Sequence, residues 1–393
     1  MEGIDKNIMT NNFDFAVVGG GLFGSAATRH LATQGKNVVL FAPEEPTDVT
    51  SHDGVFASHY DEARITRILD VDELWSDLAR SSISSYKQIE NDSGINFHYS
   101  TRYLFLCHEE IDSINASARV GEAHNVAFEL LDRNALTERM PFLDIKSGEK
   151  ALLEPPPAGY VNPRALVRAQ LKCAKSKGAH VINQMVSKVE EMPEGVRIIT
   201  STGENYFANN VLLATSIHTN NLIDSPLDLT INGALIVFAK LSDSLIESLS
   251  DMPSISHRPA SGINSYLLPP VTYPNGATYI KIGLSNSTRT LREDKEVREW
   301  FRVGSDPNEE QIAKDAMTGL IPSLKNQPMH FETCATTHTA SGYPYIGKIS
   351  NRINVCVGGN GYGAKSSDEI GRLGASVLQG ESIDERFKPR FID

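Results

Sequence analysis

FDFAVVGGGLFGSAATRHLATQGKNVVLFAP, residues 13–43, decides the fold of this chain. An apolar strand at 15–18 leads into a glycine cluster, and the helical stretch after it ends at Gly35. A second apolar strand follows at 38–41. Strand, helix and strand in this order predict a βαβ unit, in which the helix crosses between two parallel strands.

Gly19, Gly21 and Gly24 have the GxGxxG spacing of a dinucleotide-binding turn. The first glycine permits a tight turn, the second leaves an open approach for a pyrophosphate, and the third allows close packing of helix against strand. The N-terminus of the helix then faces the phosphates with unpaired N–H groups and a favourable dipole. The spacing alone leaves NAD and FAD undecided.

One feature of such a unit is missing at the end of the second strand. An acidic residue is expected there, where it would hold the ribose hydroxyls, but the position is Ala42. Glu44 and Glu45 follow shortly after it. Either of them could reach back to the ribose, and the alternative is a solvated acidic loop without that contact.

The chain continues the α/β pattern and then departs from it. GYVNPRALVRAQLKCAKSKGAHVI (159–182) predicts a helix that begins at a proline and ends at Gly178, before a strand. Further strands are predicted near 186–189 and 196–199. Between about 222 and 333, strand-like pieces alternate with turn clusters, which indicates an inserted, mainly antiparallel domain.

The tail INVCVGGNGYGAKSSDEIGRLGASVLQG (353–380) returns to strand, glycine loop and helix. We therefore expect an α/β (α+β) fold with two discontinuous domains. The cofactor domain is expected over 13–92, 150–221 and 335–393, and the substrate domain over 93–149 and 222–334.

Composition excludes several classes of protein. The 393 residues carry a formal net charge of -12, and Lys and Arg dominate no long stretch, which argues against nucleic-acid and membrane-surface partners. No apolar run approaches the roughly 20 residues of a membrane span, and the polar start MEGIDKNIMTNN lacks the apolar core of a secretion signal. We expect a cytoplasmic protein, either a monomer or a homodimer.

The cysteines indicate neither disulfides nor a metal site. Cys107, Cys173, Cys334 and Cys356 are far apart, without a CxxC pair or a His cluster at metal-ligand spacing.

Six motifs in order resemble the D-amino-acid-oxidase-like flavoprotein superfamily, and within it the monomeric sarcosine oxidases and N-methyl amino acid oxidases. They are VVGGGLFGSAA (17–27), SHYDEARITR (58–67), GYVNPRALVRAQLKCAKSKGA (159–179), YIKIG (279–283), CATTHTASGYPYIG (334–347) and GGNGYGAKSS (358–367). The resemblance implies FAD as the cofactor. It also implies a Rossmann-like FAD-binding domain of the glutathione-reductase type, with an inserted antiparallel-sheet substrate domain.

Cys334, in FETCATTHT, matches the cysteine that forms a thioether to the flavin 8α-methyl in these enzymes. A covalent tether would offset a weakened ribose contact. The alternative is a small buried hydrophobe, which is the commonest role of a lone cysteine. The resemblance also places four further residues against the cofactor: Tyr60, Val186, Gly361 and Gly363.

Arg64 and Arg67 lie at i, i+3 spacing in DEARITRI, which we interpret as helical, so both would project from one face. By resemblance, Arg67 and Lys365 grip the substrate carboxylate, while Arg64 and Lys365 lie at the flavin. The alternatives are surface pairs of the arginines with neighbouring acids and a solvated lysine in a helix first turn.

Lys281 lies in TYIKIGL, where alternation puts Tyr279, Lys281 and Gly283 on one face of a strand. Such a lysine is usually exposed. The resemblance instead makes it the cation beside the flavin that stabilises superoxide, which favours an oxidase, and it retains Tyr266 as a pocket residue.

Four pocket positions depart from the sarcosine oxidase pattern. Tyr60 and Ser285 stand where histidines are usual, Thr336 replaces a tyrosine, and Ser216 replaces a glycine that approaches the flavin. The smaller Ser and Thr side chains should enlarge the pocket. We therefore expect a bulkier N-alkyl or cyclic amino acid rather than sarcosine itself.

Together these features predict an FAD-dependent amine oxidase acting on a small carboxylate-bearing secondary amine or amino acid. A hydride would pass to flavin N5, and O2 would be reduced to H2O2. Two alternatives remain open: a flavin dehydrogenase of an amino or 2-hydroxy acid with another electron acceptor, and a flavin-binding protein without catalytic activity.

Overall fold

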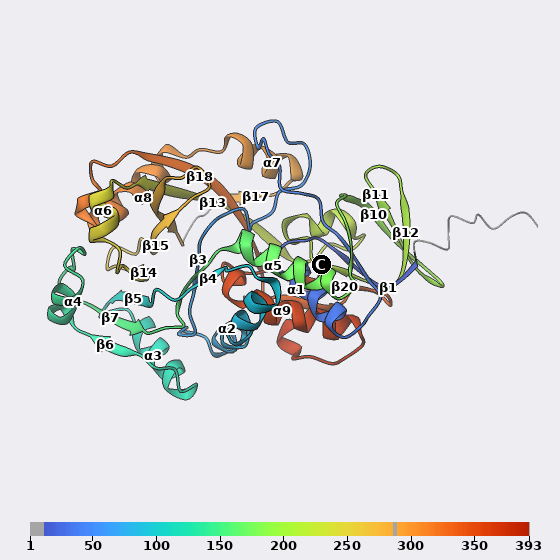
Figure 1. Ribbon diagram of the computed structural model, residues 1–393, viewed down its shortest axis with the longest axis horizontal. Coiled ribbons are helices and arrows are strands. Elements are labelled where there is room, and N and C mark those ends of the chain that lie inside the picture. The colour runs from blue at the N-terminus through green and yellow to red at the C-terminus, as the bar shows by residue number, and fades with distance from the viewer. Residues whose placement is uncertain (1–11, 286–288, 393) are drawn as a thin grey trace, which may run out of the picture.

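The computed structural model describes residues 12–285 and 289–392 (Figure 1). Most of the polar N-terminal segment, in which we expect no secretion signal, lies outside the described residues. The predicted βαβ unit is confirmed: it consists of β1 (Asn12–Val18), α1 (Leu22–Thr33) and β2 (Val38–Phe41). β1 and β2 are parallel, with Phe15 opposite Val38.

Within the described residues, eight strands form the first sheet, ordered β10-β11-β12-β1-β2-β9, with β20 on β12 and β19 on β20. The added strands are β9 (His180–Ile182), β10 (Val186–Met192), β11 (Gly195–Thr200), β12 (Asn205–Leu213), β19 (Tyr345–Lys348) and β20 (Ile353–Val357). α1 packs against α5 (Pro163–Ser176) and α9 (Gly363–Leu378), and both of these helices pack with α2 (Glu73–Ser93). α5 begins at a proline after Asn162, as predicted.

The second sheet lies at the left of Figure 1, with the first sheet at the right. Its order in the described part of the chain is β17-β13-β16-β15-β14-β5-β7-β6, with β18 on β13. The strands are β5 (Tyr103–His108), β6 (Glu129–Leu131), β7 (Glu149–Glu154), β13 (Leu229–Lys240), β14 (Ser254–Arg258), β15 (Ser265–Thr272), β16 (Thr278–Leu284), β17 (Arg289–Leu291) and β18 (Met329–Thr339). Within this second sheet, all described strand pairs are antiparallel except the pair of β5 with β14.

Shorter elements complete the chain. The remaining helices are α3 (Ser113–Ala123), α4 (Arg133–Arg139), α6 (Asp243–Ser248), α7 (Asp294–Val303) and α8 (Pro307–Leu320), and the short 3-10 turns are η2 (Ser216–Leu222), η3 (Pro322–Leu324) and η4 (Glu385–Phe387). A small third sheet has the order β3-β8-β4, from Arg64–Thr66, Gly159–Val161 and His98–Tyr99.

The predicted combination of a Rossmann-like layer and a mainly antiparallel second sheet is confirmed. The two stretches expected to form the substrate domain do contribute to one sheet. β5 and β6, from the first stretch, lie in the same sheet as β13, β14, β15, β16 and β17, from the second. Two strands of that sheet, β7 and β18, run past the expected boundaries at 150 and 334. We therefore propose that the boundaries lie after these strands.

The helix expected around Arg64 and Arg67 is wrong. Residues Arg64–Thr66 form β3, which pairs with β8 so that Arg64 lies opposite Val161. A strand of three residues is too short to show the alternation of buried and exposed side chains that is typical of strands. The spacing of Ile65 and Ile68, three positions apart in RITRI, therefore resembled that of a helix. Arg67 follows the strand in irregular backbone.

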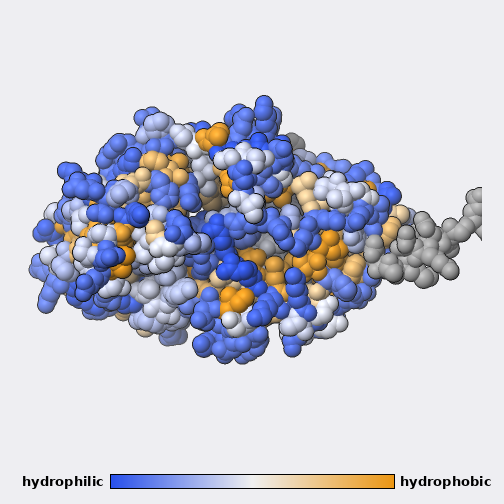
Figure 2. Space-filling model, turned by 45° about the horizontal axis from the view of Figure 1, so that its top comes forward, coloured by the Kyte–Doolittle hydropathy of each residue, from blue (hydrophilic) through white to orange (hydrophobic). Residues whose placement is uncertain are grey.

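Apolar residues on the face drawn in Figure 2 are exposed in small areas among mainly hydrophilic ones. No helix in the described ranges is long and apolar enough to cross a membrane. Over the same residues, no group of His, Cys, Asp and Glu could hold a metal ion.

Candidate active site

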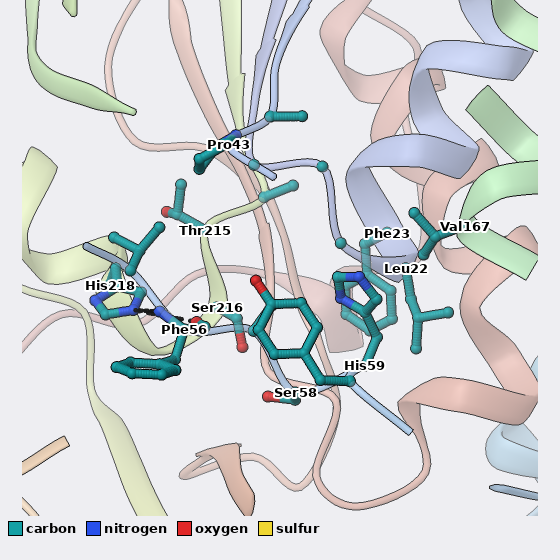
Figure 3. Close-up of a pocket in the computed structure, with 18 of the residues that line it drawn as sticks. Leu22, Phe23, Pro43, Phe56, Ser58, His59, Val167, Thr215, Ser216 and His218 are labelled. Atoms are coloured by element: carbon teal, nitrogen blue, oxygen red, sulfur yellow. Dashed lines mark hydrogen bonds between the residues drawn. The ribbon is translucent and has the colours of Figure 1, made fainter. Parts of the chain in front are cut away.

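A cavity of about 850 Å³ lies where the first sheet, α1, α5 and the start of α9 meet β18. Figure 3 shows Leu22, Phe23 and His59 on one side of it and Phe56 and His218 on the other. Its size falls within the range of cofactor and small-molecule sites, about 300–1,000 Å³.

The three glycines of the first turn differ in what an added Cβ would meet. Gly19 has φ +103°, and a Cβ there would lie 2.5 Å from the Ala214 carbonyl oxygen. A Cβ on Gly24 would collide with the Gly19 carbonyl oxygen, so Gly24 permits helix and strand to pack. Over Gly21 the nearest atom would be His59 Nδ1, at 3.8 Å, so this backbone is open to the cavity.

Two helices begin at the cavity wall without a side-chain cap. Gly21, which has no side chain, precedes α1, and Tyr362, whose side chain accepts no hydrogen bond from the helix, precedes α9. By contrast, Asn162 caps α5 by accepting from the Ala165 N–H. Uncapped N–H groups and the dipoles of two helices suit an anionic pyrophosphate. Together with the open backbone at Gly21, they fit the diphosphate of a dinucleotide such as FAD.

Both candidate ribose ligands lie on the cavity wall after β2. Glu44 accepts a hydrogen bond from Asn183 Nδ2 at 2.7 Å, and Glu45 pairs with Arg164 Nη2 at 2.6 Å. Glu45 is held by a multidentate contact with this guanidinium.

Cys334 lies at the end of the cavity formed by β18. All four cysteines are described, and Cys334 alone is not buried. Its Sγ accepts a long hydrogen bond from Arg64 Nη2 at 3.6 Å. Tyr266 packs against the same apolar cluster as Cys334. Gly283 allows its approach, because a Cβ there would lie 2.5 Å from the Tyr266 hydroxyl.

Lys281 is buried rather than exposed, with 1% of its surface accessible. Its Nζ donates to the Asp61 carboxylate and to the Ala63 carbonyl oxygen. Asp61 also pairs with Arg64 and accepts from the Tyr273 hydroxyl at 2.9 Å. Lys281, the predicted oxygen-activating residue, therefore has a buried counter-ion that the sequence did not reveal. Burial and the Arg64 cation lower the pKa of Lys281 well below its usual value, and the contact with the Asp61 carboxylate favours the charged form.

Arg67 and Lys365 are brought together by the acid Asp70. Asp70 Oδ2 lies 2.8 Å from Arg67 Nη1 and 2.7 Å from Lys365 Nζ. The Tyr362 ring lies close to both cations, with its centroid 6.0 Å from Arg67 Cζ and 5.5 Å from Lys365 Nζ. Burial lowers the pKa of Lys365 to about 8, against the opposing effect of Asp70.

The predicted residues thus divide into two groups. Those on the cavity wall are Gly19, Gly21, Tyr60, Arg64, Val186, Cys334, Gly361 and Gly363. Those that do not line it are Gly24, Arg67, Tyr266, Lys281 and Lys365. Of the departures noted in the sequence, Thr336 and Ser216 line the cavity, whereas Ser285 is exposed.

Ser216 has φ +49°, a left-handed conformation that glycine adopts more readily. This backbone explains why glycine would be usual there. The Ser216 hydroxyl is 2.9 Å from the Thr337 hydroxyl, which ties η2 to β18 at the cavity wall.

Two histidines that line the cavity, His59 and His218, were not predicted from the sequence as functional residues. Burial, together with the Arg164 and Arg64 cations, lowers the pKa of His59 to about 3, so His59 is neutral at neutral pH. His218 Nδ1 is 3.0 Å from Asp294 Oδ1, and its other ring nitrogen contacts the Phe56 backbone. The hydrogen bond with His218 lowers the pKa of Asp294 to about 2. No sequence spacing could have indicated this pair.

Comparison with known proteins agrees with the architecture. A family model described as FAD dependent oxidoreductase matches residues 14–377. The chain is 24% identical over 379 residues to a monomeric sarcosine oxidase of Bacillus sp. (strain B-0618), which covers 93% of this chain and 92% of that one. NikD, an unusual amino acid oxidase essential for nikkomycin biosynthesis, aligns in its open form with a TM-score of 0.78 at 16% identity, covering 97% of this chain and 98% of that one. L-proline dehydrogenase from P. horikoshii aligns with a TM-score of 0.76 at 20% identity, covering 95% of each chain.

Proposed function

Because the chain belongs to the FAD dependent oxidoreductase family, we propose that it oxidises the carbon–nitrogen bond of a small amine that carries a carboxylate. One observation carries the choice of substrate. Arg67 and Lys365 hold a common carboxylate oxygen, that of Asp70, at 2.8 and 2.7 Å. Two cations that converge on one oxygen are suited to grip the carboxylate of an amino acid or N-alkyl amino acid.

When bound, FAD supplies the acceptor for the electron pair of the C–N bond, and the protein supplies position and field. Arg67 and Lys365 orient the substrate through its carboxylate. His59, neutral at the cavity wall, adds no charge near the amine. Cys334, beside Arg64, is suited to anchor the flavin covalently.

Lys281 supports O2 as the electron acceptor and H2O2 as a product, because a preorganised cation would stabilise superoxide. A second candidate is a dehydrogenase with another acceptor. It is favoured by the contact of Lys281 Nζ with the Asp61 carboxylate, which offsets the lysine's charge.

An anaerobic screen of matched amines tests the proposal. L-Proline and L-pipecolate should bleach the visible absorbance of the bound flavin, whereas pyrrolidine and piperidine, which lack only the carboxylate, should bleach it far more slowly. We call Arg67 and Lys365 together the carboxylate clamp. Equal rates within each matched pair would contradict the proposal that this clamp binds the substrate carboxylate. If no amine bleaches the flavin, the protein binds a flavin without this activity. Peroxide formed under air, measured against dye reduction, then separates oxidase from dehydrogenase.

We expect carboxylate binding to weaken above about pH 8, where Lys365 loses its proton. Below that pH the ammonium is charged and binds the anion; above it the dissociation constant should rise by up to about tenfold per pH unit. Methoxyacetate, an ether analogue of sarcosine, reports this without a titrating amine, through the absorbance of the bound flavin. Lys365→Arg keeps its charge over this range, so the rise should disappear. A rise that persists in Lys365→Arg would assign the titration to another group.

A further inference from the structure

Asp70 stands between the two cations proposed to bind substrate. It is 2% exposed, and Lys365 is 3% exposed. Its Oδ2 bridges Arg67 and Lys365, while its Oδ1 accepts from the Val71 N–H at 2.8 Å. Burial alone would raise the pKa of Asp70, but the Arg67 and Lys365 cations hold it below its usual value. Asp70 is therefore an anion over the working pH range.

No other carboxylate in the described residues forms a salt bridge with either cation. Glu154 lies near them, but its two oxygens accept from the backbone N–H groups of Ile68 and Leu69, each at 2.9 Å. Burial also raises the pKa of Glu154, which further weakens it as a counter-ion. The charge of the clamp is thus offset by Asp70.

The position of Asp70 in the chain allows it to exchange with another anion. It lies in irregular backbone between β3 and the start of α2, where no sheet ladder fixes it. Its contact with Val71 is local. Tyr362, next to both cations, stands in sequence between Gly361 and Gly363 of the cavity wall. The cluster is therefore connected to the cavity wall through Tyr362 and its neighbouring glycines, although Arg67, Asp70 and Lys365 do not themselves line the cavity.

We propose that Asp70 is an internal competitor for the substrate carboxylate and so determines substrate selectivity. The inference rests on the proposed function, since it assigns a carboxylate to the same two cations. An incoming carboxylate must take the place of Asp70 Oδ2 at Arg67 and Lys365, and this exchange offsets most of the energy of the new ion pairs. The protein should therefore favour an acid over its neutral amide only weakly.

A purely structural role makes a different prediction. If Asp70 served only to fix the local backbone through its contact with the Val71 N–H, its removal would destabilise the fold and leave anion affinity unimproved. Competition predicts that removing the negative charge tightens anion binding. The dissociation constant of a carboxylate therefore separates the two roles where stability alone does not.

The test titrates the flavin-loaded protein with methoxyacetate and with its neutral amide, methoxyacetamide, following the absorbance of the flavin. In the native protein the two dissociation constants should agree within about tenfold, and a preference for the acid of about 100-fold or more would overturn the inference. In Asp70→Asn, methoxyacetate should bind at least about tenfold more tightly, with methoxyacetamide nearly unchanged. Because the comparison within the native protein needs no variant, the result does not depend on whether Asp70→Asn folds.

Two variants serve as controls. Asp70→Glu keeps the charge and should not tighten binding. Asp368→Asn removes another buried acid, 2% exposed and 2.7 Å from Arg29 Nη2, and should also leave the affinity for methoxyacetate unchanged. Tightening in Asp368→Asn, or weak or unchanged binding in a folded Asp70→Asn, would overturn the inference. Neither probe can be oxidised as an amine. Failure of the amine screen would therefore contradict the proposed function, and the binding of these two probes could still be interpreted.

Discussion

Replacing Cys334 with serine is expected to release the flavin from the protein under acid. Precipitated native protein should keep its yellow colour in the pellet, whereas the pellet of Cys334→Ser should be colourless and its supernatant yellow. The reason is the position of the thiol: it lines the cavity, is not buried, and lies 3.6 Å from Arg64 Nη2. A thioether would also compensate for the absence of an acid at Ala42.

Cys356 provides a matched control, because it too borders the cavity. It is buried in β20, and burial raises the pKa of its thiol, so it should remain protonated and unreactive. Cys356→Ala should therefore keep the colour in the pellet. Yellow supernatant from the native protein would rule out the bond, and release from Cys356→Ala alone would move it to the other cysteine.

Local patterns in the sequence predicted most of the fold. The βαβ unit, the helix that begins at Pro163 and the glycine loop before α9 each depend on neighbouring residues, so their signals survive in a single sequence. The conformation of β3 could not be predicted in this way. β3 is only three residues long, and its partner strand β8 begins far away in the sequence, at Gly159. Long-range pairing fixed its conformation, and local spacing could not.

The candidate site was predicted as a set of cations, and the structure adds their counter-ions. Lys365 and Asp70 are 295 positions apart, and Lys281 and Asp61 are 220 apart. Acids close to Arg64 and Arg67 in sequence looked like partners in surface pairs. Once folded, Asp61 and Asp70 are buried against lysines from distant parts of the sequence. The sign of the electrostatic field at such a site can therefore be assigned only from the three-dimensional structure.

Replacing Lys281 with methionine is expected to slow the reaction of the reduced protein with O2 by about 10²–10³-fold, the usual effect of removing one preorganised charge from a reacting centre. Anaerobic reduction by an amine should change far less, since the carboxylate clamp does not include this residue. Stopped-flow measurement of the two half-reactions separates these rates. The fold should survive, because Asp61 keeps Arg64 and the Tyr273 hydroxyl as partners.

The same substitution at an exposed strand lysine tests whether the effect is local. Lys188, on β10 and 64% exposed, should tolerate methionine with both half-reactions unchanged. Equal losses in the two half-reactions of Lys281→Met would indicate general damage to the site. If the reduced native protein already reacts slowly with O2, Asp61 has cancelled the useful charge of Lys281, and a dehydrogenase with another acceptor becomes the better description. Asp61→Asn, which leaves the lysine in place without its counter-ion, should then raise the rate with O2.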